Sequence, residues 1–331
     1  MINNIQPKFL INFQGRKSKY TPKQKELAMR FAKEGLTLDE IVKISEKYPY
    51  INNSIPYTLE YNIREFVKLH AEDGLTVEQQ LKAAKKQPSL FCSKPLTLSN
   101  KINDLYDFVA PYGITKKDII KQQNTNPILR VMSAQTLIKN MRDIPERYKD
   151  SGLTEEEYVN ITMQDNHMPA IKVQNFEKKI NDLIDYYADL DMTEQDLIKA
   201  FKKHRLIITN SFKNVTEKID SWRFIEENKL SDNGKTISKN ELKDLILRKQ
   251  LTHSLESNML YLLRCKLNSY YQTKIPAKKT KESLSKFIVE NSNKTFTIPV
   301  LDGKFTNKFK DIVSTLSKEL VNKNIFEIVI K

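Results

Sequence analysis

Hydrophobic positions recur along this chain with a period of 39 residues. Five segments open with a Gly or Asp, then Leu, Ile or Met, then Thr, and they start near residues 35, 74, 113, 152 and 191. Six columns at this spacing are apolar in all five copies. Such self-similarity is typical of repeat proteins, in which each unit buries its apolar face against the next. The pattern predicts a solenoid.

The six apolar columns are Leu36/Leu75/Ile114/Leu153/Met192, Val42/Leu81/Ile120/Val159/Ile198, Ile51/Leu90/Leu129/Met168/Ile207, Leu59/Leu98/Leu137/Phe176/Val215, Ile63/Ile102/Met141/Ile180/Ile219 and Phe66/Leu105/Ile144/Leu183/Trp222. We expect all of them to be buried.

Each repeat is expected to contain two helices. In the first repeat, Thr37 is followed three residues later by Glu40, which is the spacing of a capping box at a helix N-terminus. Pro49 ends this first helix, because the residue before a proline avoids the α region. Apolar residues three and four apart then indicate one face of a second helix. The predicted helices span about 38–48 and 58–71.

The two ends of the chain depart from the repeat. We expect a flexible basic arm over residues 1–20 and a helical array over 21–272, which includes a degenerate sixth repeat near 237. Residues 273–331 change character: a lysine-rich linker precedes two strand-like segments, 295–301 and 325–330, around a helix near 306–322. The predicted fold is therefore all-α, a solenoid of about five to six two-helix repeats, with a small α/β (βαβ) appendage at the C-terminus.

The repeat resembles that of a known family. Leu36-Thr37-x-x-Glu40-Ile41, then Pro49-x-Ile51, then an amphipathic helix, is similar to the repeat of the mitochondrial transcription termination factor (mTERF) family, and repeats two and three follow the same pattern. The resemblance covers about 35–229, and repeats four and five lack the proline. It implies a right-handed helical superhelix that binds double-stranded DNA or RNA through a basic inner surface.

The charge of the chain gives this implication mixed support. The net charge is +14, but residues 35–236 are nearly neutral in sum, and repeats one and four are acidic. Most of the positive charge therefore lies towards the two ends.

The two cysteines, Cys92 and Cys265, form no metal or redox motif, which favours reduced thiols in an intracellular protein. No apolar run is long enough to span a membrane, so a membrane partner is not expected. A transit peptide is an alternative interpretation of the N-terminal arm.

Lysines cluster in two columns of the first helices. The columns are Lys43/Lys82/Lys121/Lys199 and, four residues further on, Lys47/Lys86/Lys203. Residues four apart share a helix face, so stacked first helices should carry a continuous ladder of lysines that could contact phosphates. Arg130 is expected to add a bidentate phosphate contact. The alternative interpretation is an ordinary solvated face made of common lysines.

No catalytic, cofactor or metal site is expected. The four histidines have no metal-ligand spacing to one another or to the cysteines. Gly234-Lys235-Thr236 lacks the first glycine of a phosphate loop, which favours a hinge. We therefore expect a non-enzymatic protein that binds DNA or RNA. The rival hypothesis is a protein-interaction scaffold, such as a secreted bacterial effector, and an enzymatic C-terminal module is a further alternative.

Overall fold

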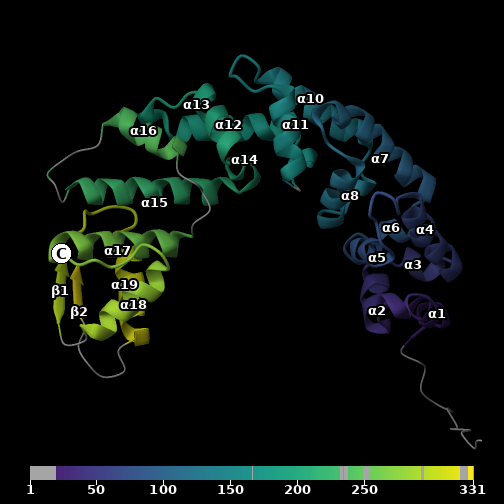
Figure 1. Ribbon diagram of the computed structural model, residues 1–331, viewed down its shortest axis with the longest axis horizontal. Coiled ribbons are helices and arrows are strands. Elements are labelled where there is room, and N and C mark those ends of the chain that lie inside the picture. Colours follow the sequence, from purple (N-terminus) through teal and green to yellow (C-terminus); the bar gives the residue numbers. More distant parts are fainter. Residues whose placement is uncertain are drawn as a thin grey trace, which may run out of the picture. The chain divides into compact units, whose positions relative to one another are not determined.

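The computed structural model describes residues 20–165, 167–231, 234, 238–248, 254–291, 294–320 and 327–330. The arm predicted for residues 1–20 lies, apart from Tyr20, outside them. The chain forms two compact parts, residues 1–138 and residues 139–331. Both are built mainly from helices, and the two long helices predicted for each repeat are confirmed (Figure 1).

The long helices follow the predicted boundaries within about two residues. A half-repeat at the start supplies α1 (Pro22–Arg30). The first long helices of the six repeats are α2 (Leu38–Lys47), α5 (Val77–Lys86), α8 (Lys116–Thr125), α11 (Glu155–Gln164), α13 (Glu194–Lys203) and α16 (Lys239–Arg248). The second long helices are α4 (Pro56–Leu69), α7 (Pro95–Val109), α10 (Ala134–Arg147), α12 (Val173–Tyr186), α15 (Phe212–Ser231) and α17 (Leu255–Tyr271).

The stretch between the two long helices of a repeat also forms one helical turn, which the sequence analysis did not predict. Proline precedes three of these turns, where its missing N–H costs nothing because the first N–H groups of a helix have no partner within it. The turns are α3 (Tyr50–Asn53), α6 (Ser89–Cys92), α9 (Ile128–Val131), the 3-10 helix η3 (Met168–Ala170) and α14 (Leu206–Thr209). Further 3-10 turns follow α1, α7 and α12: η1 (Ala32–Glu34), η2 (Ala110–Tyr112) and η4 (Ala188–Leu190).

The six apolar columns form the core. Every member is buried except Val42, which is half-buried in the first repeat, where only a half-repeat precedes it. The capping boxes are confirmed as well: Thr37 accepts a hydrogen bond from the backbone N–H of Glu40, and the side chain of Glu40 accepts one from the backbone N–H of Thr37. Equivalent boxes begin α5, α8, α11 and α13.

The turn before each first helix has a left-handed residue. Gly35 has φ +75°, a conformation that glycine adopts without a steric penalty, and glycines occupy the same place before α5, α8 and α11. In the fifth repeat Asp191 takes this role with φ +50°. Aspartate is among the non-glycine residues that most readily adopt a positive φ, so the fifth repeat forms the same turn without a glycine.

A polar column joins successive repeats. In five helices, one Lys or Asn side chain donates a hydrogen bond to a backbone carbonyl in the last residues of the next one-turn helix or directly after it. The donors are Lys23, Asn62, Lys101, Asn140 and Lys179, and the acceptors are the carbonyls of Asn53, Phe91, Val131, Pro169 and Asn210, at 2.7–3.2 Å. These carbonyls lack a partner in their own short helix, so the column satisfies groups that every repeat leaves open.

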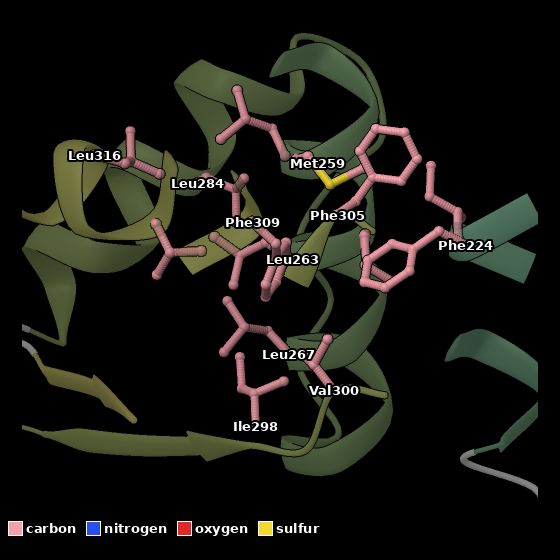
Figure 2. Close-up of a cluster of buried hydrophobic side chains, with 14 of the residues drawn as sticks. Phe224, Met259, Leu263, Leu267, Leu284, Ile298, Val300, Phe305, Phe309 and Leu316 are labelled. Atoms are coloured by element: carbon pink, nitrogen blue, oxygen red, sulfur yellow. The ribbon is translucent and has the colours of Figure 1, made fainter. Parts of the chain in front are cut away.

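The C-terminal segment folds as a βαβ unit against the last repeat. It consists of α18 (Thr280–Glu290), β1 (Thr295–Ile298), α19 (Thr306–Leu320) and β2 (Glu327–Ile330), and the two strands pair in parallel with Thr295 opposite Glu327. The predicted appendage is thus present. Figure 2 shows that its side chains, such as Phe309 and Ile298, share one hydrophobic cluster with Leu263 of α17 and Phe224 of α15. The core therefore continues across residue 272.

Candidate functional site

The seven ladder lysines all lie on the first helices and are exposed. Lys43 and Lys47 are on α2, Lys82 and Lys86 on α5, Lys121 on α8, and Lys199 and Lys203 on α13. None of them forms an ion pair with a residue that the structure describes. Their charge is thus not directly paired, and the acid that acts on one of them is Asp118, whose pKa is lowered first by its hydrogen bonds with Thr115 and then also by Lys121 and Lys117.

The helices α5 and α8 enclose a groove of about 540 Å³. Three ladder lysines, Lys82, Lys86 and Lys121, line it together with Lys117, which the sequence analysis missed. Lys117 precedes Lys121 by four residues, so the Lys–x₃–Lys pair of the third repeat is shifted by one turn relative to that of the second. A search for lysine pairs four apart, without a fixed column, would have found it.

One carboxylate, that of Asp73, also lines this groove. Its Oδ2 atom lies 2.9 Å from Nδ1 of His70, whose Nε2 lies 3.1 Å from Oγ of Ser99. Asp73 is thus held by a buried imidazole, and the lysines keep their excess of positive charge. The three residue types are those of a hydrolytic triad, but His70 is 2% exposed and Ser99 is 9% exposed, so no substrate reaches the serine. The arrangement joins α4 to α7.

The groove between the first two repeats contains an ion pair that this one lacks. Between the first two repeats, Lys85 Nζ lies 2.9 Å from the Oε2 atom of Glu40, the capping-box acid of α2. The backbone hydrogen bond from Thr37, followed by the bond from Lys85, holds the pKa of Glu40 below its ordinary value. Between repeats two and three the equivalent residues are Gln79 and Asn124, which are neutral. The groove is positive because four lysines and one carboxylate line it.

Arg130 is not on the ladder surface, which corrects the sequence analysis. It is 1% exposed, because α9 places it behind α5 and α8. Its Nε donates to Gln123 Oε1 at 3.2 Å, its Nη1 to Gln80 Oε1, and its Nη2 to Asn124 Oδ1 at 2.8 Å. The sequence does not reveal this burial, because arginine is rarely buried without an acid.

The ladder is interrupted in the fourth repeat. Asn160 occupies the lysine column on α11, and the first turn of that helix carries Glu155, Glu156 and Glu157. Glu157 pairs with Lys202 of α13 at 2.7 Å, while the ladder residues Lys199 and Lys203 stay exposed. The lysine surface thus has two segments, α2–α5–α8 in the first part of the chain and α13 in the second.

Other candidate chemistry adds nothing to this site. Within the described ranges no group of three His, Cys, Asp or Glu side chains is placed to hold a metal ion. Both cysteines are free thiols. Gly234 has φ +63°, but Lys235 and Thr236 of the proposed hinge lie outside the described residues. Where helices are described, none combines the length and apolar character needed to cross a membrane.

Comparison with models of protein families identifies the family of this chain. The model of the mTERF family matches residues 18–226, which run from the start of α1 into α15 and include both lysine segments. A search of curated proteins found no match. The C-terminal βαβ unit lies outside the matched region.

Proposed function

Because the chain belongs to the mTERF family, whose members are helical-repeat proteins that generally bind nucleic acids, we propose that it binds double-stranded DNA or RNA through its lysine ladder. The observation that carries this proposal is the groove between α5 and α8. Four exposed lysines meet there, and none has an ion-pair partner among the described residues.

The physical basis is the release of counterions. A nucleic acid carries a condensed layer of cations, and each phosphate that a lysine neutralises releases some of them. Lysines already paired with carboxylates, such as Lys85 and Lys202, would have to give up those partners first. The ladder lysines have no ion pair among the described residues to give up, so they are the side chains that gain most from a phosphate.

The test is a salt titration of binding to a mixed-sequence duplex. Each phosphate contact contributes about −0.9 to the slope of log K against log salt, so replacing Lys43, Lys82, Lys121 and Lys199 by Gln should reduce the slope by up to about 3–4. Glutamine has nearly the helix propensity of lysine, and exposed lysines contribute little to stability. The variant should therefore melt like the wild type.

The matched control replaces four lysines of the C-terminal segment by Gln: Lys278, Lys279, Lys281 and Lys286. Binding of the control should keep its full salt slope. If the control loses binding and the ladder variant does not, the ladder is not the nucleic-acid surface.

A second candidate function is protein binding. It is favoured by exposed apolar side chains on the first two repeats: Ile55 is 63% exposed, Tyr57 62%, Tyr61 50% and Leu96 67%. Exposed apolar groups of this size occur at protein interfaces. If the wild type binds neither duplexes nor single strands at about 50 mM salt, where phosphate contacts are strongest, this second function replaces the first.

A further inference from the structure

The buried guanidinium of Arg130 has no negative partner among the described residues. All three of its hydrogen-bond acceptors are neutral amides, those of Gln80, Gln123 and Asn124. Its Cζ atom lies 5.2 Å from the centre of the Phe66 ring. Burial lowers the pKa of Arg130 to about 10, so the side chain still carries its charge at neutral pH. A buried charge without a counter-charge is costly to fold.

The fold itself does not require this charge. In the second and fifth repeats the position of Arg130 is occupied by Phe91 and Ile208, both buried, and in the first by the uncharged Asn52. The position of Gln80 is likewise occupied by buried apolar residues in the other repeats, for example Ile41 and Ile119. The two polar replacements occur together, between repeats two and three. Departures from an otherwise consistent core pattern are expected at functional positions.

Asn124 connects this buried charge to the groove. It lines the groove between α5 and α8, and its Oδ1 atom accepts the hydrogen bond from Arg130. The amide Nδ2–H₂ group is then the half of the side chain that can donate to a ligand. A hydrogen bond from a charged group polarises the amide and strengthens the bond that it donates onward.

We propose that the groove between α5 and α8 is a binding site for one phosphate group. Asn124 and the surrounding lysines contact the phosphate, and Arg130 lies behind Asn124 as the buried counter-charge. This inference rests on the proposed function and deepens it, since it assigns the strongest phosphate contact to repeats two and three. Such a contact fixes the register of a nucleic acid on the protein and carries no base preference.

The decisive variant is Asn124→Asp in the full chain. It has the same shape, gives Arg130 a carboxylate partner and places a negative charge in the groove. Thermal stability should stay equal or rise, because the buried charge is now paired, while affinity for inorganic phosphate and for a duplex should fall about tenfold or more. The control is Gln79→Glu, which adds the same charge to the same groove without touching Arg130. Glutamate caps the first and fourth repeats naturally, so this variant folds, and its loss of affinity should be clearly smaller.

A second variant, Arg130→Met, removes the charge and keeps an apolar stem. If it folds, phosphate should no longer raise the melting temperature, whereas the wild type should show a rise that chloride at equal ionic strength does not produce. If Arg130→Met does not fold, the comparison of Asn124→Asp with Gln79→Glu tests the proposed phosphate site. Equal losses of affinity in Asn124→Asp and Gln79→Glu would contradict the proposed phosphate site. Unchanged phosphate binding in a folded Arg130→Met would contradict it as well.

The two probes separate this inference from the proposed function. If Asn124→Asp binds a duplex as the wild type does, the phosphate site is contradicted and the lysine ladder remains the proposed binding surface. The wild type could instead bind phosphate but no duplex, and Asn124→Asp could lose the phosphate binding. That result would support a site for free phosphate and contradict the nucleic-acid function.

Discussion

The side chain of Lys101 on α7 donates a 2.7 Å hydrogen bond to the backbone carbonyl of Val131, which ends α9 in the following repeat. The bond belongs to the Lys/Asn column, in which each side chain donates to a backbone carbonyl that has no partner in its own short helix. Repeats are thus joined by apolar packing and also by a regular polar contact, which has consequences for stability.

Lys101→Met should lower the free energy of unfolding by about 1–2 kcal/mol, because the carbonyl of Val131 loses a charged donor while the methionine keeps the apolar stem. Urea unfolding followed by circular dichroism measures this loss. Lys94→Met, at an exposed lysine preceding the same helix, is the control and should change little. Equal effects of the two substitutions would show that the bond to Val131 contributes nothing.

Trp222→Ala should cost about 3–5 kcal/mol, as large-to-small changes in cores do. Trp222 ends the last apolar column, is 9% exposed and packs edge to face on Tyr261 of α17 at 5.8 Å. Trp222→Phe, which keeps an aromatic ring, should lose less. An unchanged urea midpoint for Trp222→Ala would mean that the column is not part of the core at this position.

Removal of residues 273–331 should destabilise the last repeat. Phe305 and Phe309 pack in one cluster with Phe224 of α15 and Leu263 of α17, and truncation would expose that apolar surface to water (Figure 2). The truncated chain should bind a hydrophobic dye and melt earlier than the full chain. If both proteins melt alike and neither binds the dye, the C-terminal unit is an independent appendage.

Stability should fall at acidic pH in part through Glu40. The pKa of Glu40 is lowered in the folded chain, first by the backbone bond from Thr37 and then by Lys85. Its contribution is therefore complete above the unfolded value of about 4.3 and is lost as the pH falls through the folded pKa. Since the Glu40 side chain is 41% exposed, water screens the pair and the effect should be small.

Glu40→Gln should flatten the acid limb of a plot of unfolding free energy against pH, with little change in fold, because Gln79 already caps α5 in this way. Glu78→Gln, at an exposed residue in the first turn of α5, is the comparison and should leave the acid limb in place. An acid limb that is identical in wild type and Glu40→Gln would show that the Glu40 cap does not contribute to it.

The sequence by itself determined the features that are local or periodic. The 39-residue period places the same apolar residue on the same face in every repeat, so the columns from Leu36 to Trp222 identify the core without a structure. Capping boxes such as Thr37 with Glu40 span three residues, and their geometry follows from the helix itself. The ladder lysines follow from the same periodicity, since they recur at the 39-residue spacing on the first helices.

Only the tertiary structure decided which polar residues meet. Arg130 and Gln80 are fifty residues apart and occupy columns that are apolar in most other repeats, so periodicity assigns them no partner. Lys117 joins the groove because α5 and α8 pack together, and the C-terminal unit shares a core with α15 because Phe224 and Phe305 come into contact. These outcomes depend on which surfaces are brought together when the chain folds, and no short-range pattern in the sequence records that.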